Sequence, residues 1–221
     1  MKNPPLLIHR ENEINQLIEV LLRKQKQNAI IIGEPGVGKT ALVEYLAHLI
    51  NTQKVPTYLK DKCIYELDIA SIIAGTKYRG EFEEKLKKIL KKVKEDKKAI
   101  VFIDEIHNII GAGGAEGAID ASNIIKPYLS RGDICCIGAT TYDEYVKLFE
   151  KEKALERRFQ VVRIEEPSIK QTIDILLALK NDFCKYHSII INDTIINEVV
   201  KLCSLYVFDR HFPDKAIDVL D

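Results

Sequence analysis

The sequence predicts an α/β protein in which helices cover both faces of a parallel sheet, followed by a small helical domain. Short apolar runs alternate with longer segments of helical periodicity over the first three quarters of the chain, a pattern typical of parallel sheets. A glycine-rich phosphate-binding pattern follows the first of these runs. Beyond Pro167 only helical periodicity is found. We therefore expect an α/β nucleotide-binding domain over 1–167 and a helical domain over 168–221.

The expected strands are short and the expected helices are longer. A first helix is expected over 12–24, because its apolar residues recur at spacings of three and four. The apolar run at 28–33 ends in glycine, as expected for a strand buried on both faces. The other expected strands are 63–68, 99–104, 134–138 and 160–164, with a glycine-rich loop and a helix between the third and fourth strands. The other expected helices are 40–51, 81–97, 169–186, 194–206 and 213–221. Ser168 is expected to cap the N-terminus of the helix 169–186.

Composition excludes several classes of protein. The chain has 221 residues, of which 46% are hydrophobic, and its 33 basic residues balance its 33 acidic ones. This length can bury a sizeable core, and balanced charge with ample apolar content argues against disorder. A nucleic-acid partner is not expected, since it favours a basic face and a pI above about 9. No apolar run approaches the roughly 18 residues of a membrane span, and no signal peptide is visible, so we expect a soluble protein without a membrane partner.

The cysteines and histidines do not form a metal-binding pattern. Five cysteines are present, an odd number without C-x-x-C spacing, and most lie in apolar stretches. They are expected to be buried free thiols in a reducing compartment. The histidines lack ligand spacing, so no zinc site is expected.

The strongest motif is G-x-x-x-x-G-K-[ST], which lies between the first expected strand and the next helix. Backbone N–H groups of such a loop surround phosphate oxygens, and the helix N-terminus adds partial positive charge. Lys39 is expected to reach the outer phosphates and the Thr40 hydroxyl to ligate Mg²⁺. The residues expected to bind the nucleotide are Gly33, Glu34, Pro35, Gly36, Val37, Gly38, Lys39, Thr40, Ala41 and Asp104.

Two carboxylates end the third expected strand. Asp104 and Glu105 follow the apolar run at 99–103, and ligands of open α/β sheets bind at the carboxyl ends of the strands. Asp104 is expected to hold the Mg²⁺ shell and Glu105 to polarise the attacking water. Arg157 and Arg158, just before the fifth strand, could supply positive charge to a transferring phosphoryl group, although alone they could equally be a solvated pair.

With these motifs in order, the chain resembles the first AAA+ module of the Clp ATPases, the unfoldases and disaggregases of the ClpB and ClpC type. The resemblance covers almost the whole chain, in stretches such as 30–43 (IIIGEPGVGKTALV), 74–83 (AGTKYRGEFE), 101–107 (VFIDEIH), 117–127 (GAIDASNIIKP), 137–145 (IGATTYDEY), 154–159 (ALERRF) and 213–218 (PDKAID). It implies an AAA+ P-loop NTPase fold, with a five-stranded parallel sheet between helices and a lid truncated at its C-terminal end.

The resemblance implies roles for further residues. Thr141 would be the sensor-1 residue at the γ-phosphate or attacking water, and Arg157 and Arg158 would be arginine fingers acting on a neighbouring subunit. Tyr78 would grip substrate polypeptide as a pore-loop aromatic, with 111–117 as a second pore segment. His9 and Ser122 replace glycines usual in the family, and are expected to tune packing near the base pocket or the pore. No sensor-2 arginine is expected, and Asp214 and Lys215 would contact the nucleotide instead.

The implied function is an ATP- and Mg²⁺-dependent ATPase that threads unfolded or aggregated protein through the pore of a homo-hexamer, with a possible Clp peptidase partner. The chain would be one module of a longer protein, with weak activity on its own, located in the cytoplasm or in a plastid or apicoplast stroma. Two alternatives remain. One is a DNA-handling ATPase of the clamp-loader or initiator type, and the other is a regulatory module that binds nucleotide without turnover.

Overall fold

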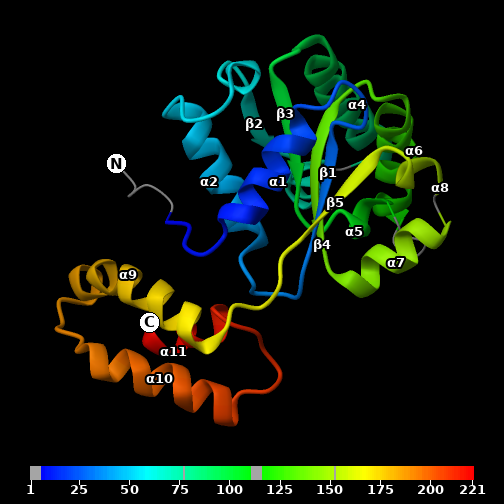
Figure 1. The fold of residues 1–221 in the computed structure, drawn as a ribbon. Coiled ribbons are helices and arrows are strands. Elements are labelled where there is room, and N and C mark those ends of the chain that lie inside the picture. The colour runs from blue at the N-terminus through cyan, green and yellow to red at the C-terminus, as the bar shows by residue number, and fades with distance from the viewer. Residues whose placement is uncertain (1–5, 77, 111–115, 152) are drawn as a thin grey trace.

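A helix-covered sheet and a cluster of three helices lie side by side in a computed structural model, which describes residues 6–76, 78–110, 116–151 and 153–221 (Figure 1). The described strands form one sheet of order β2-β3-β4-β1-β5, and every neighbouring pair is parallel. These strands are β1 (Asn28–Ile32), β2 (Cys63–Glu66), β3 (Ala99–Ile103), β4 (Cys135–Thr140) and β5 (Phe159–Arg163). The predicted five-stranded parallel sheet is confirmed.

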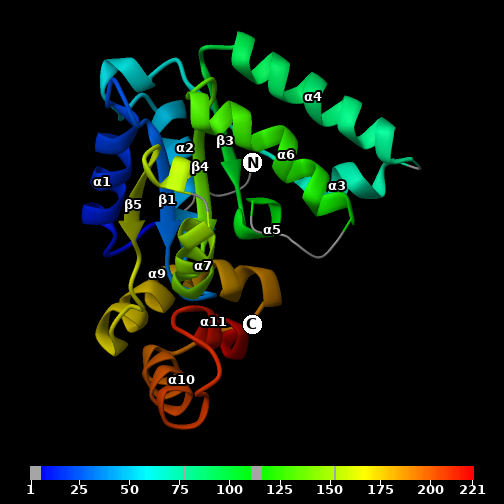
Figure 2. The same ribbon diagram turned by 90° about the vertical axis from the view of Figure 1, so that its right-hand side faces the viewer.

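Helices cover both faces of the sheet, as Figure 2 shows. One face packs on α1 (Glu11–Leu21) and α2 (Lys39–Asn51), and the other on α4 (Arg79–Glu95) and α6 (Glu116–Arg131). Side chains alternate between the two cores, so that Ile30 faces the α4–α6 side while Ile31 faces the α1–α2 side. The central strands therefore read as continuous apolar runs rather than alternating ones.

Several short elements were not expected from the sequence. They are the 3₁₀ helix Thr57–Leu59, α3 (Ile69–Ala74), α5 (His107–Ile110), α7 (Tyr142–Lys151) and α8 (Lys153–Glu156). Most are too short to show helical periodicity in a sequence window. The expectation of buried thiols is wrong for Cys63, which is exposed because β2 is an edge strand, although all five cysteines are free. Burial raises the pKa of Cys135 to about 11, so this thiol remains protonated.

The lid consists of α9 (Ile169–His187), α10 (Asp193–Tyr206) and α11 (Asp214–Leu220), packed around its own apolar core. Ser168 caps α9 in a reciprocal capping box with Gln171, as predicted. Within the described part of the chain, no helix combines the length and apolarity needed to cross a bilayer.

Gly138 allows β4 to pack closely against the segment that follows β3. A Cβ at Gly138 would lie 2.8 Å from Ile106 Cδ1. We expect Gly138→Ala to lower the free energy of unfolding by about 1–3 kcal/mol, as overpacking in cores does. Ile106→Val, which deletes Cδ1, should recover part of this loss in the double variant. Urea unfolding measures both effects, and equal losses in the single and double variants would contradict the proposed contact.

Candidate nucleotide-binding site

A cavity of about 790 Å³ lies between the carboxyl edge of the sheet and the lid. Its large-domain wall comes from the loop after β1 and from the ends of β2, β3 and β4, where ligands of open α/β sheets are bound. Its other wall comes from α9, α11 and the segment before α1. The cavity lining includes the apolar side chains Leu7, Ile8, Ile175, Leu179 and Ile217.

The loop 33–38 has the backbone of an anion-binding turn. Gly36 and Gly38 have φ angles of +79° and +99°, a left-handed conformation that glycine adopts readily. α2 begins immediately afterwards at Lys39, so the free N–H groups of its first turn face the loop. The Asp214 side chain of the lid packs against Gly36, where a Cβ would lie only 2.6 Å from Asp214 Cβ. Asp214 also lines the cavity, and its expected contact with the nucleotide stays a prediction.

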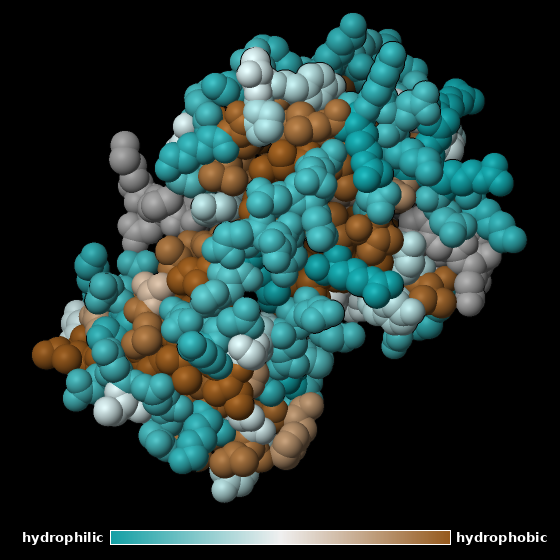
Figure 3. Space-filling view, in the orientation of Figure 1, coloured by the Kyte–Doolittle hydropathy of each residue, from teal (hydrophilic) through white to brown (hydrophobic). Residues whose placement is uncertain are grey.

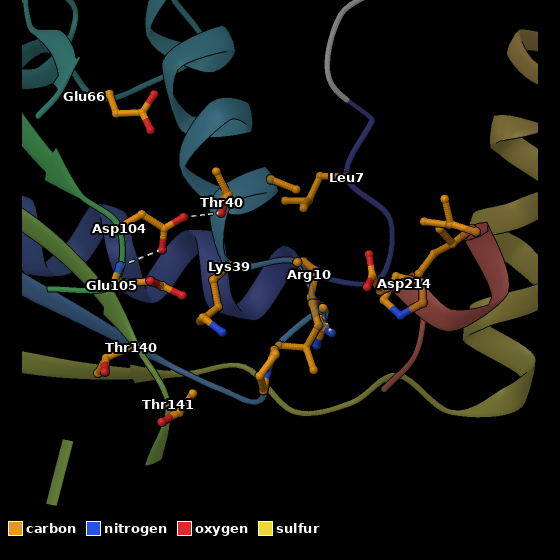
Figure 4. A pocket seen from close by; sticks show the side chains of 18 of the residues that line it. Leu7, Arg10, Lys39, Thr40, Glu66, Asp104, Glu105, Thr140, Thr141 and Asp214 are labelled. Atoms are coloured by element: carbon orange, nitrogen blue, oxygen red, sulfur yellow. Dashed lines mark hydrogen bonds between the residues drawn. The ribbon is translucent and has the colours of Figure 1, made fainter. Parts of the chain in front are cut away.

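The Lys39 side chain extends along this loop into the cavity (Figure 4). Its Nζ donates hydrogen bonds of 2.9 Å to the carbonyl oxygens of Gly33 and Glu34. An ammonium group has three donors, so a third N–H is left to reach a phosphate oxygen. Burial lowers the pKa of Lys39 below its ordinary value, although nearby carboxylates act in the opposite direction. A bound phosphate would counter this penalty by restoring a favourable environment for the charge.

Thr40 and Asp104 come together from α2 and from the end of β3. Thr40 Oγ1 donates a 2.8 Å hydrogen bond to Asp104 Oδ2, and both residues line the cavity. Mg²⁺ prefers oxygen ligands and is commonly held by one or two carboxylates together with phosphates. These two oxygen groups therefore fit Mg²⁺. No cluster of three or more His, Cys, Asp or Glu side chains suited to a metal occurs among the described residues.

Glu105 is held in an unusual backbone conformation beside this pair. Its φ angle is +46°, in the left-handed region that non-glycine residues seldom occupy. Its N–H donates to Asp104 Oδ1 at 2.9 Å, and its carboxylate accepts a 2.8 Å hydrogen bond from Asn108 Nδ2. Strained residues of this kind cluster at active sites. Sequence reasoning missed Asn108, which orients the Glu105 carboxylate.

Thr140, the last residue of β4, and Thr141, which follows it, both line the cavity. Thr141 Oγ1 accepts a hydrogen bond from the Glu144 backbone N–H at 3.3 Å and so caps α7. This bond uses a lone pair, so the hydroxyl hydrogen can still be donated to a ligand. The preceding residue, Thr140, is buried and its hydroxyl lies 2.9 Å from His107 Nδ1. Thr141 therefore caps α7 and lines the cavity, and its expected role at the outer phosphate stays a prediction.

The other predicted functional residues lie outside the cavity. Arg157 is exposed and Arg158 is half-buried, in the loop between α8 and β5 at the side of the large domain away from the lid (Figure 1). Tyr78 directly precedes α4 and is 77% exposed. The expected second pore segment, 111–117, falls mostly outside the described residues.

One expectation about the lid needs correction, and two about replaced glycines stay predictions. Lys215 does not line the cavity, because its Nζ turns into the lid and donates to the Val207 carbonyl at 2.9 Å. His9 has a φ angle of +57°, a conformation that glycine adopts more readily than other residues. Its Nε2 lies 2.8 Å from Asp174 Oδ2 of α9, and His9 does not line the cavity. Ser122 is buried in α6 and does not line the cavity, so its expected effect on packing near the pore stays a prediction.

Sequence reasoning missed Arg10, a half-buried residue at the cavity that hydrogen-bonds to the phosphate-binding loop. It also missed the apolar walls formed by Leu7 and Ile8 before α1 and by the lid. The walls before α1 are marked in the sequence only by a short apolar run. The lid residues that line the cavity could be identified only from the tertiary structure. The apolar walls provide a surface suited to a flat base, whereas Lys39, Asp104 and Glu105 lie toward the sheet (Figure 4).

The loop, the carboxylates and the helical lid define a P-loop nucleotide-binding protein. Family models agree with this class: residues 29–166 match the ATPase family associated with various cellular activities (AAA), and residues 168–221 match the AAA lid domain. The chain belongs to the AAA family of ATPases.

Similar proteins connect the chain to the Clp group, confirming that resemblance. It is 55% identical over 215 residues to the ATP-dependent Clp protease ATP-binding subunit ClpC of Staphylococcus aureus, and 53% identical to that of Staphylococcus epidermidis. These alignments cover 97% of this chain but 26% of each relative, so the chain spans about a quarter of their length. The S. cerevisiae Hsp104–ADP complex is similar in structure, with a TM-score of 0.89 and 43% identity over 100% of this chain and 37% of that one. An extended Hsp104–casein complex has a TM-score of 0.86 over the same fractions.

Proposed function

We propose that the chain is the ATP-binding and ATP-hydrolysing module of a Clp-type protein unfoldase, with 1–167 as its large domain and 168–221 as its lid. The observation that carries this proposal is the meeting of Lys39, Thr40, Asp104 and Glu105 at one end of a single cavity. The loop and Lys39 bind the phosphates, while Thr40 and Asp104 hold Mg²⁺. When bound, this ion neutralises charge on the phosphates.

In this proposal Glu105 accepts the proton of the attacking water, and Thr141 donates to the outer phosphate or to that water. Glu105 is suited to this task because Asn108 orients its carboxylate. Arg157 and Arg158 lie outside the cavity of their own chain, so they act as fingers on the nucleotide of a neighbouring subunit. Hydrolysis therefore depends on a ring, which we propose is a homo-hexamer.

Unfolded polypeptide is the proposed substrate. Tyr78 supports this, because an exposed ring that precedes a helix offers apolar contact without sequence preference. The Hsp104 structure solved with casein supports it as well. The Staphylococcus relatives are described as subunits of a Clp protease, which favours a Clp peptidase as a partner over independent disaggregation. We place the parent protein in the cytoplasm or in a plastid or apicoplast stroma.

Exposed apolar side chains on the lid support assembly with neighbours. Apolar surface covers part of the lid in Figure 3, and the exposed residues there include Ile190, Ile195, Leu202, Leu205, Tyr206 and Phe208. Four of these side chains lie on α10 and the other two flank it, and apolar side chains that gather in one region mark an interaction site more often than singly scattered ones. Balanced charge gives no support to a DNA-handling ATPase, and a regulatory module without turnover would not need the carboxylate of Glu105.

Mixing two inactive variants tests the proposed function. We expect ATPase activity per chain to rise with protein concentration, and Arg157→Ala to remove this rise, since arginine fingers contribute about 10³–10⁵ in rate. Glu105→Gln has an intact finger and a damaged site, whereas Arg157→Ala has the reverse. A mixture should therefore exceed the summed activity of the two variants.

Phosphate release over a range of protein concentrations measures these activities. Arg131→Ala, which removes an exposed arginine at the end of α6, is the matched control and should retain the concentration dependence. Activity that is independent of concentration and of Arg157 would exclude the finger role. Absence of any nucleotide hydrolysis in the wild type at all concentrations would count against the enzymatic proposal itself.

A further inference from the structure

Arg10 joins three segments that are distant in the sequence. Its Nη2 donates to the carbonyl oxygen of Glu165 at 2.7 Å and to that of Val37 at 3.3 Å. Its Nη1 donates to Glu13 Oε1 at 3.0 Å, which anchors the guanidinium to α1. The Arg10 side chain is only 11% exposed. One rigid, charged group thus bridges α1, the phosphate-binding loop and the segment after β5.

The two carbonyl groups belong to segments with different tasks. Val37 lies in the loop whose N–H groups would bind phosphates in the function proposed above. Glu165 lies between β5 and α9, where the chain leaves the sheet for the lid. Ile164 makes the last backbone bond to the sheet, and Ser168 begins the lid as the cap of α9. We call residues 165–168 the hinge. Ile164, the residue just before the hinge, packs tightly against the loop, since a Cβ at Gly33 would lie 2.5 Å from Ile164 O.

The hinge is also attached to the lid. Glu166 accepts hydrogen bonds from the Phe212 backbone N–H at 2.7 Å and from His211 Nδ1 at 3.0 Å. Burial acts to raise the pKa of Glu166, but these donors outweigh it and the pKa is lowered, which indicates a bound carboxylate. A displacement of the peptide at 165–166 is therefore transferred to the loop before α11. The path from Val37 through Arg10 to the hinge is continuous.

We propose that Arg10 is a positioning residue that transmits nucleotide occupancy of the phosphate-binding loop to the hinge of the lid. The proposal rests on the nucleotide-binding function proposed above. Phosphates that bind the loop N–H groups fix the orientation of its peptides, including the Val37 carbonyl. Because Val37 and Glu165 share one nitrogen of the same guanidinium, ordering the first carbonyl orders the second. In this way a bound nucleotide sets the angle of the lid.

Hydrogen exchange followed by mass spectrometry tests the coupling in the whole 221-residue chain. In the wild type, saturating Mg²⁺-ADP should slow exchange in peptides that cover 33–40 and in peptides that cover the hinge. In Arg10→Ala at saturating nucleotide, protection at 33–40 should remain, whereas nucleotide-dependent protection of the hinge should fall at least about fivefold. Arg10→Lys should give an intermediate result, since a lysine donates to a carbonyl but lacks the rigid fork of arginine.

Arg23→Ala is the matched control, because Arg23 makes a 2.9 Å side-chain hydrogen bond to Gln160 away from the cavity. It should leave protection of both segments unchanged. Hinge protection in Arg10→Ala equal to that of the wild type would overturn the coupling. Wild-type protein without protection at 33–40 would instead overturn nucleotide binding. If Arg10→Ala does not fold, Arg10→Lys decides: its hinge protection must fall at least about twofold at an unchanged melting temperature, and an unchanged value overturns the proposal.

Discussion

Lys39→Ala is expected to raise the Kd for ATP by at least about 100-fold and to make hydrolysis undetectable. Lys39 extends into the cavity from a loop that holds its ammonium at 2.9 Å from two carbonyl oxygens. Hydrogen bonds to charged groups are worth about 1.5–3 kcal/mol each, so losing the one phosphate contact left to this ammonium corresponds to about 10- to 150-fold in affinity. Burial of the ammonium strengthens its interaction with phosphate further, because screening by water is reduced.

Titration calorimetry with ATP and Mg²⁺ measures this change. Lys85→Ala is a close control, because Lys85 Nζ also donates to a loop carbonyl, that of Gly75 at 2.9 Å, but lies outside the cavity. It should bind ATP as the wild type does. A melting temperature measured without nucleotide separates loss of binding from loss of folding. ATP affinity of Lys39→Ala within about threefold of the wild type would show that the loop binds phosphate without this lysine.

Glu105→Gln is expected to reduce kcat for ATP hydrolysis by about 10²–10⁴, the usual contribution of a general base, while the Kd for ATP stays within about threefold. Glutamine preserves the size of the side chain and can still accept the hydrogen bond from Asn108. It cannot accept a proton from water. The change therefore removes the chemical step and leaves the binding residues Lys39 and Thr40 in place.

Single-turnover hydrolysis and equilibrium binding, carried out on the same preparation, distinguish the two effects. Glu144→Gln is the matched control, because this half-buried carboxylate lies near Thr141 but not in the cavity, and its partner is Lys147. It should hydrolyse ATP at the wild-type rate. If Glu105→Gln turned over at a rate close to that of the wild type, the water-activating group would have to be another of the cavity carboxylates, such as Glu66 or Asp68.

The long elements of the fold could be predicted because each carries its own periodicity. β1 and β3 read as apolar runs since both of their faces are buried, and the two lid helices α9 and α10 carry enough turns to show a stripe. The short helices α3, α5 and α8 could not be predicted in this way. A helix of four to six residues forms because of its neighbours rather than because of its own pattern.

The residues of the site likewise divide into those that the sequence could predict and those that it could not. Lys39, Thr40, Asp104 and Glu105 could be predicted, because a phosphate site requires particular residue types at fixed spacing beside a strand and a helix. Asn108 could not be predicted, since its role depends on one hydrogen bond to a carboxylate three residues away in a strained turn. Arg10 could not be predicted either, because its partners in the loop and the hinge are backbone carbonyl groups, which have no sequence signature.

The sequence by itself determined the phosphate-binding loop, the parallel sheet and the order of large domain and lid, because local spacing and apolar periodicity carry that information. The tertiary structure alone decided which residues of the entry segment and the lid close the cavity. It also turned Lys215 away from the cavity and placed Arg10 between loop and hinge. Contacts between segments more than a hundred residues apart arise only when packing brings backbone groups together, and no local pattern records them.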